Sequence, residues 1–235
     1  VGSWAAESLA RSGVGKITLV DFDDICITNT NRQLHAMVGA VGQKKVHVMA
    51  ERLRKINPQA EIISIEKFYN EETSAEILGS QPDIIIDAID NLTAKTHLLA
   101  TCFAQKLNVI CSGGAGSRMN PLLIEVADLS KTHKDPFLVQ IRRILRTKYN
   151  IDTEELLNIP TIFSTETPIT PYDLSYDKGM GFKCVCPQGQ NNFHSCDKRS
   201  VIHGTASFLT GSFGLIASSK AVEFLLAGIQ IKTDQ

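Results

Sequence analysis

The feature that most constrains the fold is a regular alternation of short apolar segments and amphipathic segments over the first half of the chain. Residues 16–21 (KITLVD), 61–68 (EIISIEKF), 83–90 (DIIIDAID) and 108–114 (NVICSGG) have the length and apolar content of buried strands. Helical patterns occupy residues 1–15, 41–58, 71–80 and 93–107. Alternation of this kind predicts an α/β fold with a doubly wound, mostly parallel sheet.

The pattern changes after Gly116. We expect strands at residues 122–129 and 161–166, an amphipathic helix at 135–151 and an apolar, buried helix at about 201–226. Residues 168–199, with their prolines and glycines, predict an irregular loop. Since no clean linker interrupts the chain, we predict a core at residues 1–116 and a C-terminal extension at residues 117–235 that completes the same domain.

Composition excludes several classes of protein. The formal net charge of −1 gives no overall field that would attract a nucleic acid or a membrane, although a local basic patch remains possible. No apolar run is expected to reach the roughly 18 residues of a membrane span. Cys26, Cys102 and Cys111 lie in apolar contexts, which is typical of reduced core residues and indicates a cytoplasmic protein.

The chain opens with a helix that begins VGS. In a doubly wound fold such a helix follows a strand and a glycine-rich turn, whose backbone N–H groups bind phosphate. We expect that strand and turn to be missing from this sequence, with Gly2 and Ser3 as the last members of the turn. A glycine at a helix start also has a purely structural explanation.

Four charged residues stand at the ends of elements that such a sheet uses to bind nucleotides. Asp21 ends a strand, where an acid accepts the ribose hydroxyls of a nucleotide. Arg32 and Lys45 could neutralise phosphates, and Asp90 ends another strand, where a carboxylate can hold Mg²⁺. Each has an alternative explanation: a turn residue for Asp21, surface charges for Arg32 and Lys45, and a helix N-cap for Asp90.

The segments that contain these residues resemble the adenylating domain of the ThiF/MoeB/HesA superfamily, which has a Rossmann-like fold. The resemblance rests on LVDFDDICITNTNRQ (19–33), VGQKK (41–45), INPQAEI (56–62) and DIIIDAIDN (83–91). It implies that ATP and Mg²⁺ are bound, with Asp90 as the metal ligand and with Arg32, Lys45 and Asp90 as the catalytic residues. The expected nucleotide-binding residues are Gly2, Ser3, Asp21, Asp23, Asn29, Arg32, Gln33, Lys45, Asp90 and Asn91.

Three further stretches are similar to the tRNA threonylcarbamoyladenosine dehydratases, a branch of that superfamily. These stretches are GGAGSRMNP (113–121), DLSKTHKDPF (128–137) and IFSTE (162–166). The resemblance implies ATP-dependent cyclisation of threonylcarbamoyladenosine beside the tRNA anticodon, through adenylation of its carboxylate and ring closure. It also implies a homodimer, and it allows a cysteine-desulfurase or sulfur-acceptor partner. This chain has Asn120 where that branch has aspartate before the proline.

Local charge agrees with a tRNA substrate. The expected helix at 135–151 carries Arg142, Arg143 and Arg146 on one face, which could contact an RNA backbone or simply be solvated. We expect Gly113 and Gly114, at a strand end, to lie near the reacting carboxylate, because glycine permits close approach.

Other functions remain open from the sequence alone. The principal alternative is adenylation of the C-terminal carboxylate of a ubiquitin-like or sulfur-carrier protein. Enzymes that activate such carrier proteins often have two C-x-x-C pairs that bind zinc. This chain has only Cys184, Cys186 and Cys196 near His194. A nucleotide-binding scaffold without activity and a nicotinamide dehydrogenase are less compatible with Arg32 and Lys45.

Overall fold

The computed structural model describes residues 1–171 and 203–227. Its strands form two sheets. In the first, β1 (Lys16–Val20) pairs in parallel with β2 (Glu61–Ile65). The second has the order β3-β4-β6-β5, formed by β3 (Ile85–Asp87), β4 (Val109–Ser112), β6 (Pro160–Ser164) and β5 (Ile124–Asp128). Only β5 runs antiparallel to its neighbour, so the predicted α/β fold with a mostly parallel sheet is confirmed.

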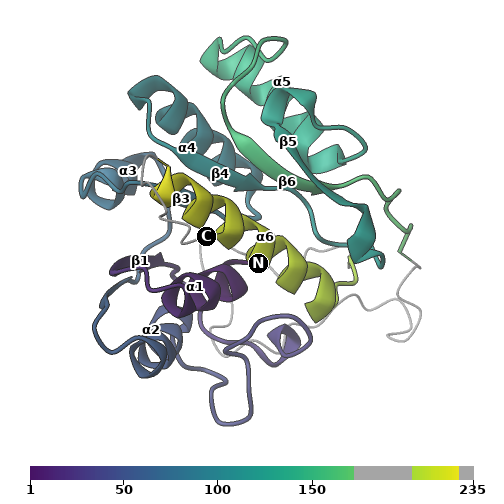
Figure 1. Ribbon diagram of the computed structural model, residues 1–235. Coiled ribbons are helices and arrows are strands. Elements are labelled where there is room, and N and C mark those ends of the chain that lie inside the picture. Colours follow the sequence, from purple (N-terminus) through teal and green to yellow (C-terminus); the bar gives the residue numbers. More distant parts are fainter. Residues whose placement is uncertain (172–202, 228–235) are drawn as a thin grey trace, which may run out of the picture.

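Helices cover both faces of the four-stranded sheet (Figure 1). One face packs against α3 (Glu71–Leu78), α4 (Leu92–Gln105) and α5 (Pro136–Tyr149), through a core that includes Leu99, Leu138 and Phe163. The other face packs against α6 (Ser207–Leu226), through Ile110, Ile162 and other apolar side chains. The core therefore continues from the first half of the chain into the second.

The smaller sheet has its own core. Here α1 (Gly2–Arg11) and α2 (Lys45–Ile56) contribute Ala10, Met49 and Leu53, which pack with Ile17 and Ile62 of the two strands. The helix α1 also runs along α6, so it joins the two parts of the molecule (Figure 1).

The helix α6 differs from the sequence expectation in one respect. By length and composition it is apolar enough to cross a membrane, although no such run was expected. Its apolar side chains Leu209, Phe213 and Ala217 are fully buried against the sheet. The packing of α6 against the sheet therefore accounts for part of its composition, while Phe208, Leu215 and Phe224 remain exposed. Of the expected irregular loop, residues 172–199 lie outside the described residues.

Candidate functional site

Two aspartates at the carboxyl end of β1 converge on a lysine from the first turn of α2. The Lys45 ammonium lies 2.6 Å from Asp23 Oδ2 and 3.9 Å from Asp21 Oδ2. The Asp21 carboxylate also accepts a hydrogen bond from the backbone N–H of Asp23 at 2.9 Å. Burial raises the pKa of Asp21, while Lys45 opposes that rise. Asp21 and Lys45 are therefore close enough to bind the sugar and the phosphates of one ligand.

Charges from three other segments meet at the N-terminal end of α1. The backbone oxygen of Arg32 accepts a hydrogen bond from Trp4 Nε1 in the first turn of the helix at 3.0 Å, and a Cβ added at Gly2 would lie 3.5 Å from the Cβ of Ala88, in the turn that carries Asp90. Asp90 also acts on the carboxyl group of Asp21. The helix N-terminus adds a partial positive charge to this region. The structure thus brings together the four charged residues that the sequence singled out, at a position suited to a phosphate-containing ligand.

The turn between β3 and α4 presents Asp90 to solvent. The alternative explanation of this residue as an N-cap is wrong, because Asn91 has that role and its Oδ1 accepts the N–H of Ala94 at 3.0 Å. Among the described residues, no three His, Cys, Asp or Glu side chains are grouped to hold a metal ion. A lone carboxylate still suits Mg²⁺, which takes few protein ligands and completes its shell with phosphate oxygens and water.

The segment that carries Arg32 is fixed by the two helices that join the sheets. The backbone oxygen of Arg32 accepts hydrogen bonds from Trp4 Nε1 of α1 at 3.0 Å and from Thr210 Oγ1 of α6 at 3.1 Å. The Arg32 guanidinium donates to the backbone oxygen of Thr28 at 2.8 Å. The position of Arg32 at the site therefore depends on both ends of the described chain.

Two predicted nucleotide-binding side chains have structural partners. Asn29 is buried, and its Oδ1 accepts the backbone N–H of Cys26 at 3.0 Å. Ser3 Oγ accepts the backbone N–H of Leu34 at 3.2 Å. In contrast, the buried Oε1 of Gln33 has no hydrogen-bond partner among the described residues. Gln33 is therefore the better candidate for a direct contact with a ligand.

Sequence reasoning missed His35. This residue is 5% exposed, and neither ring nitrogen has a hydrogen-bond partner within the described part of the chain. Burial lowers the pKa of His35 to about 4, and the nearby charge of Lys45 adds to this effect. The imidazole is therefore neutral at pH 7. No periodicity or spacing in NRQLHAM distinguishes this histidine from an ordinary core residue.

The loop after β4 is held by a buried pair, Arg118 and Asp135. A Cβ added at Gly113 would lie 2.6 Å from Asp135 Oδ2, and the N–H of Gly114 donates to the same oxygen at 2.9 Å. The Arg118 guanidinium donates to the backbone oxygens of Gly114 and Lys134. Gly113 is buried, and any larger residue at this position would clash with the carboxylate of Asp135. The structure therefore explains Gly113 by internal packing instead of by the approach of a substrate.

The arginines of α5 do not share one environment. Arg142 turns inward and donates to the backbone oxygen of Leu129 and to Thr132 Oγ1, so the expectation that it lies on an open face with the others is wrong. Arg143 is exposed, and Arg146 pairs with Glu154 at 2.9 Å on the surface. A helical pattern could not reveal this difference, because the partners of Arg142 lie in the loop that precedes α5.

The described cysteines offer no nucleophile. Cys26, Cys102 and Cys111 form no disulfide within the described part of the chain and are buried, as expected for core residues. Burial raises the pKa of Cys102 and of Cys111 to about 12 in each case, so both remain protonated thiols. Cys184, Cys186, Cys196 and His194 lie outside the described residues.

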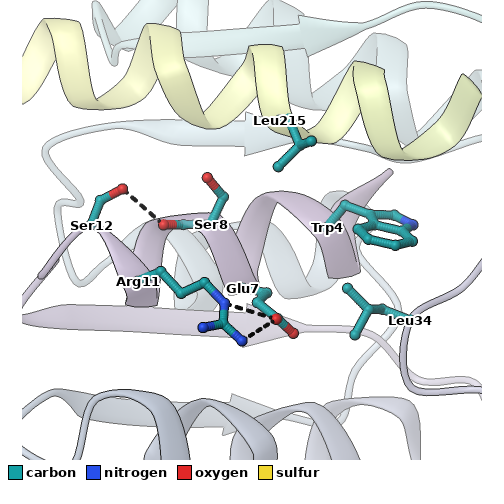
Figure 2. Close-up of a pocket in the computed structure, with 7 residues that line it drawn as sticks. All are labelled: Trp4, Glu7, Ser8, Arg11, Ser12, Leu34 and Leu215. Carbon is teal, nitrogen blue, oxygen red and sulfur yellow. Dashed lines mark hydrogen bonds and ion pairs between the residues drawn. The ribbon is translucent and has the colours of Figure 1, made fainter. Parts of the chain in front are cut away.

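A shallow pocket of about 220 Å³ lies between α1 and α6 (Figure 2). It is lined by Trp4, Leu34, Leu215 and polar residues of α1. Its charged groups satisfy one another, since Glu7 accepts hydrogen bonds from Arg11 and Arg52. The site formed by Asp21, Arg32, Lys45 and Asp90, called the charged rim below, is the stronger candidate for a functional site.

Comparisons with known proteins agree with this site. Residues 1–234 match the model of the ThiF family. A tRNA threonylcarbamoyladenosine dehydratase of Haemophilus influenzae is 40% identical over 96% of this chain and 82% of the relative. The crystal structure of the Escherichia coli tRNA N6-threonylcarbamoyladenosine dehydratase in complex with ATP superposes with a TM-score of 0.81, at 35% identity over 97% of this chain and 82% of that chain.

A less similar relative marks the limit of the match. The molybdopterin-synthase adenylyltransferase of Escherichia coli is 34% identical over 119 residues, which are 51% of this chain and 47% of that protein. Similarity over nearly the whole chain is thus found with the tRNA-modifying relatives and not with this adenylyltransferase.

Proposed function

The chain belongs to the ThiF family, and from this premise we propose that it catalyses the ATP-dependent dehydration of threonylcarbamoyladenosine in tRNA. The proposal depends chiefly on one observation. Asp21, Arg32, Lys45 and Asp90 come from four separate segments near the N-terminal end of α1, and Lys45 and Asp90 both act electrostatically on Asp21. The likeness to the tRNA-modifying relatives over nearly the whole chain supports the choice of substrate.

The reaction has a simple chemical logic. The threonylcarbamoyl group ends in a carboxylate, which cannot lose oxide. Attack of this carboxylate on the α-phosphorus of ATP releases pyrophosphate and gives an acyl-adenylate. The carbamoyl group of the same side chain then attacks the activated carbonyl carbon and AMP leaves, so one water is lost overall from the nucleoside. Because the closure is intramolecular, it needs no protein nucleophile, which fits the protonated, buried thiols.

The side chains at the site divide this work. Arg32 and Lys45 neutralise the charge that builds on the phosphates during adenylation. Lys45 exchanges its contact with Asp23 for a phosphate oxygen when ATP binds, and Asp21 accepts the ribose hydroxyls. Asp90 would hold Mg²⁺, which supplies further neutralisation of the triphosphate when it is bound. Gln33 offers a buried acceptor to the nucleotide.

Mass spectrometry of tRNA nucleosides tests the proposal. The protein is incubated with ATP and with tRNA that contains threonylcarbamoyladenosine, and we expect the modified nucleoside to lose the mass of one water. Arg32→Ala and Asp90→Ala should abolish tRNA-dependent AMP formation while the far-ultraviolet circular dichroism is retained. Lys220→Ala, which removes an exposed lysine paired with Glu223 on α6, serves as the control. Near-normal turnover of either site variant would refute its role.

The same assay, together with pyrophosphate exchange, distinguishes tRNA dehydration from the principal alternative, adenylation of a carrier protein. Adenylation of a carrier protein predicts pyrophosphate exchange with that protein and none with tRNA. Unchanged tRNA together with such exchange would replace our proposal.

The proposal extends to the setting of the enzyme. A tRNA substrate places it in the cytoplasm, and the exposed Arg143 and Arg146 of α5 would contact the RNA backbone. A homodimer is supported by large apolar side chains on the surface, among them Met37, Val38 and Leu215. Light scattering coupled to gel filtration tests the dimer, and the mass of a monomer at micromolar concentration would exclude it.

A further inference from the structure

A fully buried ion pair lies beneath the turn that carries Asp90. Asp87 is the last residue of β3, and Lys95 lies in the first turns of α4. Both side chains have zero exposure, and Lys95 Nζ lies 2.8 Å from Asp87 Oδ2. Burying two charges costs desolvation free energy that their attraction does not always repay, and apolar side chains of similar volume are often as stable. The presence of this pair therefore indicates a role other than stability.

The pair ties the strand end to the helix start. Lys95 Nζ also donates to the backbone oxygen of Asp87 at 3.2 Å, and Asp87 Oδ1 accepts the N–H of Ile89 at 3.0 Å. At the other end of the turn, the backbone oxygen of Asn91 accepts the N–H of Lys95 at 2.9 Å. The two side chains therefore connect the residues on either side of the short segment from Ala88 to Asp90.

The turn also touches the phosphate-binding end of α1. A Cβ added at Gly2 would lie 3.5 Å from the Cβ of Ala88, which is ordinary van der Waals contact. Movement of the turn would therefore change the separation between Asp90 and the N-terminal end of α1. That separation decides whether one metal ion can bridge the carboxylate and a bound triphosphate.

The ammonium of Lys95 keeps its charge in the interior. Burial is the largest single influence and lowers the pKa of Lys95, but the carboxylate of Asp87 together with Cys111 and Asp90 outweighs it, so the pKa is raised overall. Asp90 contributes to the same rise, which shows that the buried cation lies within electrostatic reach of the rim. Neutral side chains of the same shape would pack here without connecting the two sides of the turn.

We propose that Asp87 and Lys95 are positioning residues, which fix the Asp90 carboxylate, and with it a bound divalent cation, relative to the N-terminal end of α1. The inference rests on the role proposed for Asp90. Side chains that orient a metal ligand without touching the metal often change metal affinity by about 10–100-fold.

Binding of Mn²⁺, a spectroscopic substitute for Mg²⁺, tests the inference without measuring turnover. Electron paramagnetic resonance gives the affinity for Mn²⁺ in the presence of ATP, and calorimetry with a chelator gives the affinity for ATP alone. The double variant Asp87→Asn/Lys95→Met removes both charges at nearly constant volume, so it should fold even where Lys95→Met does not. Lys95→Arg restores the cation, and Lys220→Met is the matched surface control.

We expect the double variant to bind Mn²⁺ about tenfold more weakly with ATP present, while its affinity for ATP without metal changes less than twofold. Lys95→Arg should recover part of the loss. A folded double variant that binds Mn²⁺ as tightly as the parent protein would overturn the inference. Asp90→Asn separates the two claims: if it leaves Mn²⁺ affinity unchanged, the metal-binding role of Asp90 fails, and the inference fails with it.

Discussion

His35 is the residue at the site whose state differs most from its state in water. Its imidazole is buried beside Lys45, and the cost of removing a charge from water holds its pKa near 4. An unfolded chain leaves the same ring at an ordinary pKa of about 6.5. Between these two values the unfolded protein binds one more proton than the folded protein does.

Stability should therefore fall as the solution is acidified. The free energy of unfolding contributed by neutral His35 is fully present above pH 6.5 and is lost as pH falls towards 4. The loss should reach about 3 kcal/mol. Urea denaturation of the parent protein and of His35→Asn at pH 7 and pH 4.5 measures it. If both proteins lose the same free energy over this interval, the buried imidazole is not the cause.

Some residues of the site and of its surroundings could be predicted from the sequence, and others could not. Asp21, Lys45 and Asp90 could be predicted, because each stands at the end of a strand or the start of a helix. Arg118 and Lys95 could not, because their charge is cancelled by Asp135 and Asp87 across turns of the folded chain. A polar residue in a helical pattern is expected to face solvent, and only the tertiary structure shows that Lys95 does not.

Among the elements, α1 and α6 make the closest contact at Gly214. A Cβ at this position would lie 2.6 Å from the backbone oxygen of Val1 and 2.7 Å from the Cβ of Trp4. Neither atom can move without shifting the helix backbone. The small residues of α6 therefore determine how near the two helices lie, and through them the position of the Arg32 segment.

Replacement of Gly214 by alanine should force the helices apart. We expect a loss of about 1–3 kcal/mol in the free energy of unfolding, together with weaker ATP binding because the carbonyl of Arg32 is held by both helices. Gly15→Ala is the control, since a Cβ there meets no atom within 4 Å. Thermal denaturation of the two variants compares them, and equal melting temperatures would contradict the packing argument.

The order of the elements followed from hydrophobic periodicity, as the strand at residues 16–21 and the helix that begins at Lys45 illustrate. The pairing of strands did not follow from it. Nothing in the apolar run IFSTE indicates that β6 lies between β4 and β5, or that β5 runs antiparallel to it. Pairing depends on which faces the helices cover, and that is decided by residues far apart in the chain.

Across the whole molecule, a formal net charge of −1 gives no general attraction to RNA. In our proposal, affinity for tRNA comes from local groups, and Arg143, which is exposed on α5, is the candidate. Arg142, one residue earlier, points into the protein. The two neighbours offer a comparison in which the charge removed is the same and the environment differs.

Arg143→Ala should weaken tRNA binding with little effect on stability. The slope of the logarithm of the binding constant against the logarithm of salt concentration should fall by about one for each lost phosphate contact. Arg142→Ala should instead lower the melting temperature, since it removes the guanidinium that donates to Leu129 O and to Thr132 Oγ1, and the Thr132 oxygen loses its donor. Filter binding at several salt concentrations measures the slopes, and identical slopes for Arg143→Ala and the parent protein would exclude Arg143 from the RNA interface.

The contact between α1 and α6 also has a consequence for biosynthesis. Translation produces the strands and charged side chains of the nucleotide rim first, yet the carbonyl of Arg32 is held in part by Thr210. We therefore expect a nascent polypeptide on the ribosome to reach its full affinity for ATP after α6 has emerged from the exit tunnel, well after the charged side chains of the site.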